Sequence, residues 1–251
     1  MKKSVIRPIL NLLGVVAVLI VNGLANALPL NNLSTGEISD RFDVFFVPAG
    51  YVFSIWGVIY IALIAFGIYQ VLPSQRQNPR LAKIGYWFLL SCLANIAWLF
   101  CWHYELFALS LVMMLILLAS LIIIYLRLDI GIKKVSTKEK WLVNIPFSLY
   151  LGWITVATIA NVTSVLDYYG WNEWGLSEQM WTLIMLFAVA LIGALMSLTR
   201  GDVVYCLVLI WAVVGIAVKH SLVSLVSTGA WLTAIFVLVI MVVGVIKSRR
   251  K

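Results

Sequence analysis

The sequence contains a series of apolar segments of about 20 residues, the length that an α-helix needs to cross the hydrocarbon core of a bilayer. Only 11% of the residues are charged, whereas soluble domains carry about 25%. No stretch between the segments is long enough to form a soluble domain. The sequence therefore predicts an all-α, polytopic helical membrane protein with about eight transmembrane helices, at residues 8–30, 48–72, 84–102, 106–126, 141–162, 179–198, 202–219 and 221–246.

The basic residues are distributed unevenly along the chain. Sixteen of the 18 lysines and arginines lie before the first segment or after the second, fourth, sixth and eighth, and only Arg41 and Lys219 lie on the opposite side. Loops rich in lysine and arginine stay in the cytoplasm. The pattern predicts an even number of spans in a plasma- or inner-membrane type of bilayer, with both termini cytoplasmic if the first helix is retained. The net charge of +8 thus reports topology: it indicates the lipid bilayer as a partner and no nucleic acid.

The N-terminal segment is open to two interpretations. Its basic start, apolar stretch and small-x-small end at Ala25-Asn26-Ala27 resemble a cleavable signal. Its apolar part is longer than a usual signal core, which favours retention as a helix. Cleavage would leave seven spans and keep the loop 31–47 outside, so the charge pattern fits both interpretations.

Ionisable side chains are nearly absent from the predicted spans. His103, Glu105 and His220 lie at predicted outer helix ends, where we expect interfacial roles. The spans contain no zinc-binding His/Glu spacing, no phosphate-binding glycine loop and no nucleophile–base pair, and the three cysteines lie in or beside apolar runs. We therefore expect no metal, no proton-driven pump and no hydrolase; photochemistry of a bound ligand is the one enzymatic reading left open.

Aromatic rings and carboxamides recur inside the spans. The segment PAGYVFSIWGVIY places Phe53, Trp56 and Tyr60 on one helical face, and the third and fifth spans carry similar stripes. Counting about 1.5 Å per residue, Trp56 and Trp153 both lie roughly 12 Å below the predicted outer rim. Apolar walls with a few orienting polar groups are typical of a ligand cavity. Amides and small residues also join helices in membranes, so helix packing remains the alternative interpretation.

Four short motifs carry a family resemblance. PAGYVF and WGVIY are similar to Pro-x-x-Trp-x-Phe and Trp-x-x-Leu-Tyr in the second helix of the tryptophan-rich sensory protein family (TspO/MBR), which is related to the mitochondrial translocator protein or peripheral-type benzodiazepine receptor. Tyr51 stands where that family has a tryptophan. ANIAW and WITVATIAN resemble the third- and fifth-helix patterns. Phe53 and Trp56 are one residue closer than in the family, Met113 replaces a common acidic residue, and Trp211 lies outside the pattern and is expected in the core.

The resemblance implies a TspO-like five-helix bundle over residues 1–163, to which residues 164–251 add three transmembrane helices and a basic cytoplasmic tail. It also implies a pocket in the outer half of the bundle, capped by the loop after the first helix. Its ligand would be a tetrapyrrole such as porphyrin or haem, or a sterol-like lipid. The ligand-binding residues implied are Tyr51, Phe53, Trp56, Tyr60, Asn95, Trp98, Trp153, Ala157, Asn161 and Arg41.

These observations lead to the hypothesis of an integral membrane receptor or carrier for a planar hydrophobic ligand. The rings would stack on the ligand, Asn95 and Asn161 would orient its polar edge, and Arg41 would meet a carboxylate. No cofactor is required, although porphyrin or haem is a candidate bound group. Two alternatives stay open: a small-molecule transporter or channel that uses the three extra helices, and a membrane assembly subunit without a small ligand. A homodimer is a further candidate arrangement.

Overall fold

The structure, a computed structural model, describes residues 6–27 and 30–249, with the backbone alone for Asn26 and Arg249. Lys2, Lys3, Arg250 and Lys251, which the charge argument uses, lie outside the described residues. Within the described part, all regular secondary structure is helical, which confirms the all-α prediction. The long helices are α1 (Ile6–Ala27), α3 (Ile55–Val71), α5 (Trp87–His103), α6 (Phe107–Arg127), α8 (Ile145–Tyr168), α9 (Glu178–Arg200), α10 (Val203–Lys219) and α11 (Ser224–Arg249).

Each long helix falls on one of the predicted spans. Six of the helices described are long and apolar enough to cross a membrane, and α5 and α10 are apolar helices of 17 residues. The protein is therefore an integral, polytopic membrane protein. Short helical segments lie between the long ones: α2 (Thr35–Ser39), the 3₁₀ turn η2 (Gly50–Ser54), α4 (Pro79–Ala82), α7 (Thr137–Glu139), the π-helical turn η4 (Lys140–Asn144) and the 3₁₀ turn η5 (Glu173–Gly175).

The chain folds into two compact units. Unit 1 contains the residues up to Ile38 together with Trp56–Leu151, and unit 2 contains Ser39–Ile55 together with the residues from Gly152 onward. Helix α8 passes through the boundary, and the loop between α1 and α3 is divided between the units. The family resemblance divides the chain differently, between residues 163 and 164, where the five-helix family pattern ends. The division into compact units does not test that boundary, which stays a prediction.

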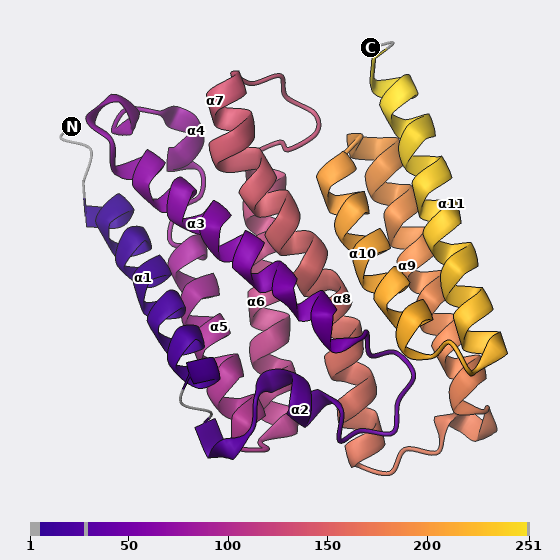
Figure 1. Ribbon diagram of the computed structural model, residues 1–251. Helices are drawn as coiled ribbons and strands as arrows, with labels where there is room; N and C mark the ends of the chain where they lie inside the picture. Colours follow the sequence, from indigo (N-terminus) through magenta and orange to yellow (C-terminus); the bar gives the residue numbers. More distant parts are fainter. Residues whose placement is uncertain (1–5, 28–29, 250–251) are drawn as a thin grey trace. The chain divides into compact units, whose positions relative to one another are not determined.

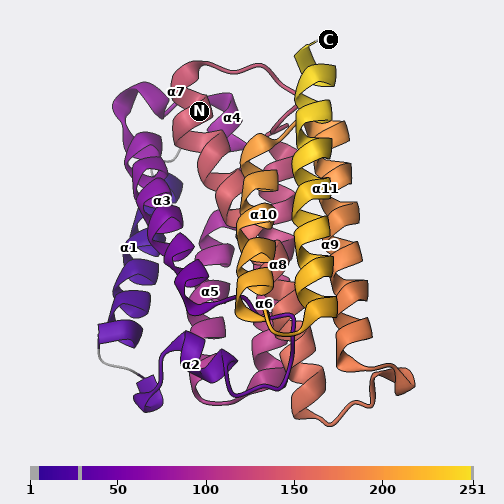
Figure 2. The same ribbon diagram turned by 45° about the vertical axis from the view of Figure 1, so that its right-hand side comes forward.

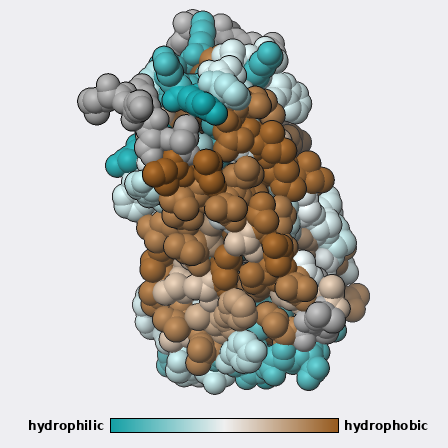
Figure 3. All heavy atoms as spheres, turned by 90° about the vertical axis from the view of Figure 1, so that its left-hand side faces the viewer, coloured by the Kyte–Doolittle hydropathy of each residue, from teal (hydrophilic) through white to brown (hydrophobic). Residues whose placement is uncertain are grey.

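In unit 1, α5 packs against both α1 and α6. Helix α1 is two-sided: its buried face carries Asn11, Val15, Val18 and Asn22, and an apolar stripe lies on the opposite face. The stripe is made of Ile9, Leu13, Val16, Ile20 and Leu24, all spaced three or four residues apart. Figure 3 views this side of the molecule and shows a broad hydrophobic band between hydrophilic ends. An exposed band of this kind is what a lipid-facing surface requires.

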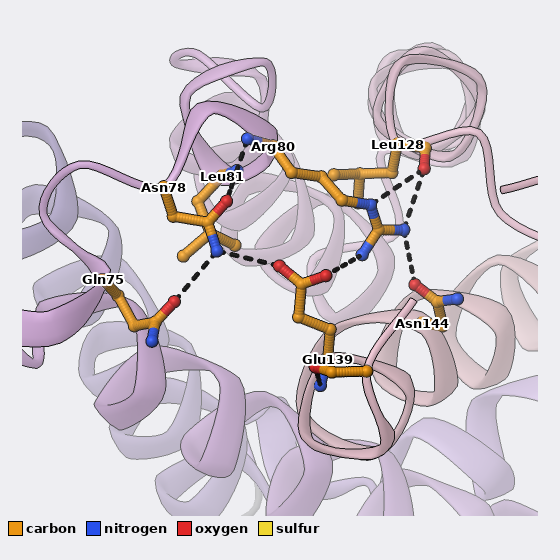
Figure 4. A network of polar contacts seen from close by, with 8 residues as sticks. Gln75, Asn78, Arg80, Leu81, Leu128, Glu139 and Asn144 are labelled. Atoms are coloured by element: carbon orange, nitrogen blue, oxygen red, sulfur yellow. Dashed lines mark hydrogen bonds and ion pairs between the residues drawn. The ribbon is translucent and has the colours of Figure 1, made fainter. Parts of the chain in front are cut away.

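At one end of unit 1, the buried Arg80 side chain joins three segments (Figure 4). Its Nε and Nη2 atoms donate to the Leu128 carbonyl at 3.2 and 2.8 Å, and Nη2 also donates to Asn144 Oδ1 at 2.6 Å. Glu139 lies 3.7 Å from Nη1, and Asn78 donates to this carboxylate at 2.8 Å. Burial lowers the pKa of Arg80, and the Glu139 carboxylate opposes that effect.

In unit 2, α9, α10 and α11 pack side by side (Figures 1 and 2). The sequence determines where they begin and end. The Ser177 hydroxyl accepts from the Met180 amide at the start of α9, and the Asp202 carboxylate accepts from the Tyr205 amide at the start of α10. Between them, Gly201 closes α9 in the left-handed conformation at φ 60°, which other residues rarely adopt. A two-residue connection therefore suffices to reverse the chain.

Candidate functional site

Four of the ten predicted ligand-binding residues belong to unit 1: Trp56, Tyr60, Asn95 and Trp98. The rings of Trp56 and Tyr60 stack with centroids 5.4 Å apart and planes 23° apart. Both side chains are half-buried. The fully buried Tyr150 meets the Trp56 ring edge-on at 6.1 Å and forms the wall behind it. One residue pair of the predicted set thus lies in direct contact on one turn of α3.

A chain of buried hydrogen bonds supports this wall. Asn22 Nδ2 donates to Asn95 Oδ1 at 3.0 Å, and Asn95 Nδ2 donates to the Tyr150 hydroxyl at 3.2 Å. Helices α1, α5 and α8 are therefore joined by side-chain hydrogen bonds. Asn95 is 1% exposed and uses both ends of its amide within the protein. A ligand that is oriented by Asn95 would have to use the second lone pair of its oxygen or displace Asn22.

Trp98 lies in a second aromatic group on α5. It stacks on Trp102 at 5.9 Å and 19°, and Trp102 meets Phe107 edge-on at 5.3 Å. Trp98 is 7% exposed, so it is a core residue of unit 1 in this structure.

The loop after α1 is fastened to the end of α5 by His103. The Nδ1 atom lies 3.0 Å from the Leu30 carbonyl, which can only accept, so Nδ1 carries a proton. The Nε2 atom lies 3.1 Å from the Thr35 hydroxyl, and Trp102 Nε1 donates to the Thr35 carbonyl at 3.3 Å. His103 is 0% exposed. His103 is the last residue of α5, as expected, and its interfacial role stays a prediction. An imidazole with two loop partners can be buried there at little cost.

The other six predicted residues belong to unit 2: Tyr51, Phe53, Trp153, Ala157, Asn161 and Arg41. Phe53 meets Trp153 edge-on with ring centroids 5.8 Å apart, and Trp153 is 3% exposed. Asn161 is buried further along α8, Ala157 is half-buried, and Arg41 is exposed in the loop. The structure thus brings Phe53 and Trp153 together, and the functional role of the ten residues stays a prediction.

Tyr51 lies against a residue outside the predicted set. Its ring meets Trp211 of α10 edge-on at 5.4 Å, and Trp211 Nε1 donates to the Val52 carbonyl at 3.1 Å. The Ala49 amide also donates to the Gly215 carbonyl at 3.1 Å. Trp211 is 39% exposed, so the expectation of a core position is wrong; its indole instead donates to a backbone carbonyl within η2.

The predicted ligand-binding set leaves out three residues that contact it: Asn22, Tyr150 and Trp211. Two of them carried a usable signal, because Tyr150 lies one turn before Trp153 and Asn22 shares a helical face with Asn11. Trp211 carried none, since its contact joins positions 159 residues apart.

Unit 2 also contains a cavity beside the second half of the loop. Its interior has a volume of about 20 Å³, room for about one water molecule, and its lining includes Phe45, Asp167, Trp171, Glu173, Glu178 and Trp181. Nearby, Phe45 meets His220 edge-on at 5.1 Å, and burial and the neighbouring Lys219 charge lower the pKa of His220. Among the described residues, no three His, Cys, Asp or Glu side chains are grouped so as to hold a metal ion.

The sequence profile of the family described as TSPO-like protein matches residues 8–243, which is nearly the whole chain. The chain belongs to the TSPO-like protein family. This match confirms the resemblance seen in the four motifs, and it extends beyond residue 163 over most of the three last helices. No curated protein and no solved structure gives a significant match to the chain. Family membership indicates a membrane protein that binds a ligand.

Proposed function

We propose that this TSPO-like protein is a membrane receptor or carrier for a planar hydrophobic ligand, a tetrapyrrole such as porphyrin or a sterol-like lipid. The observation that carries the proposal is the Trp56–Tyr60 stack: two half-buried, nearly parallel rings at 5.4 Å. A third flat molecule can extend such a stack, and each aromatic pair adds about 0.5–1.5 kcal/mol beyond burial.

The surroundings of the stack support the same ligand class. Tyr150 holds the Trp56 ring from behind, and the hydrogen-bonded amides behind Tyr150 fix its orientation. A preformed aromatic surface loses little side-chain entropy when a ligand binds. Apart from its two chain neighbours and its own helix backbone, Gly57 has no described atom within 4 Å of the place where a Cβ would lie. A ligand can therefore approach α3 closely.

The test is a titration of the purified protein with protoporphyrin IX, read from the absorption of the porphyrin itself. We expect Trp56→Leu and Tyr60→Leu each to weaken binding by about tenfold, since each removes a stacking partner and its buried area. Trp153→Leu tests the second aromatic pair separately. Trp141→Leu is the matched control, because Trp141 is 63% exposed and belongs to neither pair.

Equal affinities in the wild type, Trp56→Leu and Tyr60→Leu would contradict the proposal, provided that the variants unfold at the wild-type temperature. Competition by a sterol would identify the second ligand class. A receptor and a carrier are then separated by porphyrin flux in reconstituted vesicles, where a pure receptor gives none above the lipid background.

A further inference from the structure

Two arginines contact the turn that leads into α5. Arg7 Nη1, near the start of α1, donates to the Ala82 carbonyl at 3.2 Å. Arg127 Nη1, at the end of α6, donates to the Lys83 carbonyl at 3.4 Å. These carbonyls belong to consecutive residues, whose Cα atoms are about 3.8 Å apart. The two guanidinium groups therefore lie at the same turn of unit 1, one from each of two helices that pack against α5.

Both guanidinium groups keep N–H groups for a further partner. A guanidinium carries five N–H donors, and within the described residues each of these arginines donates to one carbonyl. Arg7 is half-buried, and Arg127 is exposed. The Arg127 guanidinium also lies over the Trp87 ring, with Cζ 5.7 Å from the ring centroid. This contact holds the planar group at the turn, so its remaining N–H groups are preorganised for an anion.

Positive charge predominates around the turn. Lys83 adds a third cation, which lies 3.4 Å from the Asp129 carboxylate, and both side chains are exposed. An exposed pair of this kind leaves both charges largely solvated. Arg7, Lys83 and Arg127, which we call the basic rim, thus have one carboxylate beside them for three cations. The net positive potential of the basic rim attracts an anion.

An apolar stripe begins at the same turn. The side chains of Tyr86, Leu90, Leu93 and Phe100 are all exposed, and their spacing of three, four and seven residues places them on one face of α5. We call this set the α5 stripe. It is about 21 Å long at 1.5 Å per residue, and one leaflet of the hydrocarbon core is about 15 Å thick. The α5 stripe is therefore long enough to accompany an acyl chain through one leaflet.

We propose that the basic rim and the α5 stripe together bind an anionic phospholipid, with phosphatidylglycerol as the representative of the class. The phosphate accepts N–H groups from the two arginines, and the acyl chains lie along the stripe. The lipid thereby joins α1 to α6 across the start of α5. None of these residues belongs to the predicted planar-ligand set, so the inference does not depend on that proposal.

Other occupants fit this surface less well. A soluble anion such as inorganic phosphate would leave the α5 stripe unused. A zwitterionic phospholipid is disfavoured because its ammonium group would meet the arginines. In the predicted topology, this end of unit 1 faces the cytoplasm, and the cytoplasmic leaflet is the one that attracts basic segments through its anionic lipids.

The test is native mass spectrometry of the full-length protein in detergent, titrated with phospholipids of equal chain length. In detergent, no anionic bilayer surrounds the other basic residues. We expect one phosphatidylglycerol to bind about tenfold more tightly than phosphatidylcholine. Arg7→Gln and Arg127→Gln should each weaken phosphatidylglycerol binding by about fivefold, while glutamine keeps an N–H donor for the carbonyl. Arg76→Gln is the matched control, because Arg76 is exposed in the connection between α3 and α4 and lies outside the basic rim.

Charge-retaining variants separate lipid binding from a structural role. Arg7→Lys and Arg127→Lys should weaken binding by only about twofold, since lysine keeps the charge and loses the planar fork. Phosphatidylglycerol should also raise the unfolding temperature of the wild type more than that of the two glutamine variants. Equal affinity losses in the lysine and glutamine variants would overturn the proposal. So would an equal loss in Arg76→Gln, or equal affinities for phosphatidylglycerol and phosphatidylcholine.

A competition experiment identifies the source of the phosphate. Glycerol phosphate carries the charge of the headgroup and has no acyl chains. If it displaces phosphatidylglycerol when present at the same concentration, the basic rim is a site for soluble anions and the proposal fails. Retention of the lipid supports the proposal, because the α5 stripe then contributes to the affinity.

Discussion

The two units differ in the residues that join their helices. In unit 1, buried amides connect the helices: Asn11 donates to Gln70 at 3.0 Å, and Asn22 and Asn95 continue the pattern to Tyr150. In unit 2, helices approach where side chains are small. A Cβ on Gly193 would lie 3.1 Å from Val237, and one on Gly152 would lie 3.1 Å from Val208.

The difference teaches how a helix pair is stabilised in lipid, where apolar surface gains nothing by leaving water. Hydrogen bonds between side chains and close backbone approach are the two remaining sources of stability. Unit 1 has close glycines as well: Gly67 and Gly14 meet side-chain atoms of Leu12 and Cys92. A hydrogen-bonded interface can exchange one partner for a ligand atom, whereas a backbone contact leaves no room for one.

The largest effect is expected at the polar end of unit 1. Arg80→Met removes four contacts and leaves Glu139, 16% exposed, without its cation. We expect the free energy of unfolding to fall by about 3 kcal/mol, because breaking a buried ion pair strands the remaining charge. Lys83→Met is the control: its pair with Asp129 is 52% and 42% exposed and should contribute less than about 1 kcal/mol. Equal losses in the two variants would show that burial does not distinguish the pairs.

A somewhat smaller effect is expected from Gly244→Ala in unit 2. The new Cβ would collide with the Ser197 hydroxyl and with the Ser197 backbone, which cannot swing away. Separating α9 and α11 also strains the hydrogen bond from Ser197 to the Ile240 carbonyl at 2.6 Å. We expect a loss of about 2 kcal/mol, measured by thermal unfolding in detergent. Gly57→Ala is the control, because there is open space at that position, and it should leave the free energy of unfolding unchanged. A similar loss in Gly57→Ala would show that the collision with Ser197 is not the cause of the loss in Gly244→Ala.

The smallest effect is expected for single hydrogen bonds between helices, which can be measured in both units. A double-mutant cycle of Asn22→Ala and Asn95→Ala measures the coupling between the amides of α1 and α5. We expect about 0.6 kcal/mol, the typical value for interhelical hydrogen bonds in membranes. The same cycle on Thr155 and Tyr205, whose hydroxyls lie 2.8 Å apart in unit 2, should give a similar value. A coupling near zero in unit 1 alone would mean that its amides contribute through packing.

Much of the fold could be predicted because each helix is specified locally. Twenty-residue apolar runs, the Ser177 and Asp202 caps and the glycine at position 201 are readable without knowledge of any partner. The stack of Trp56 on Tyr60 was also predictable, because residues four apart on a helix are neighbours.

The candidate sites were less predictable. The burial of His103 depends on the Thr35 hydroxyl and the Leu30 carbonyl, 68 and 73 residues away, and the partner of Trp211 lies 159 residues away. The cavity of unit 2 is formed from four separate segments whose aromatic and acidic residues read singly as belt and loop residues. The periodicity of a single segment does not indicate which distant segments contact it.

The sequence by itself determined that this chain is a helical membrane protein of the TSPO-like family, since hydropathy, capping and motif order are local properties. The tertiary structure alone decided which rings and amides meet, that the loop after α1 is divided between two units, and that three carboxylates surround one cavity. The reason is physical: lipid solvates all apolar helix surfaces about equally well. Which helices pack together therefore depends on a few long-range hydrogen bonds and close contacts.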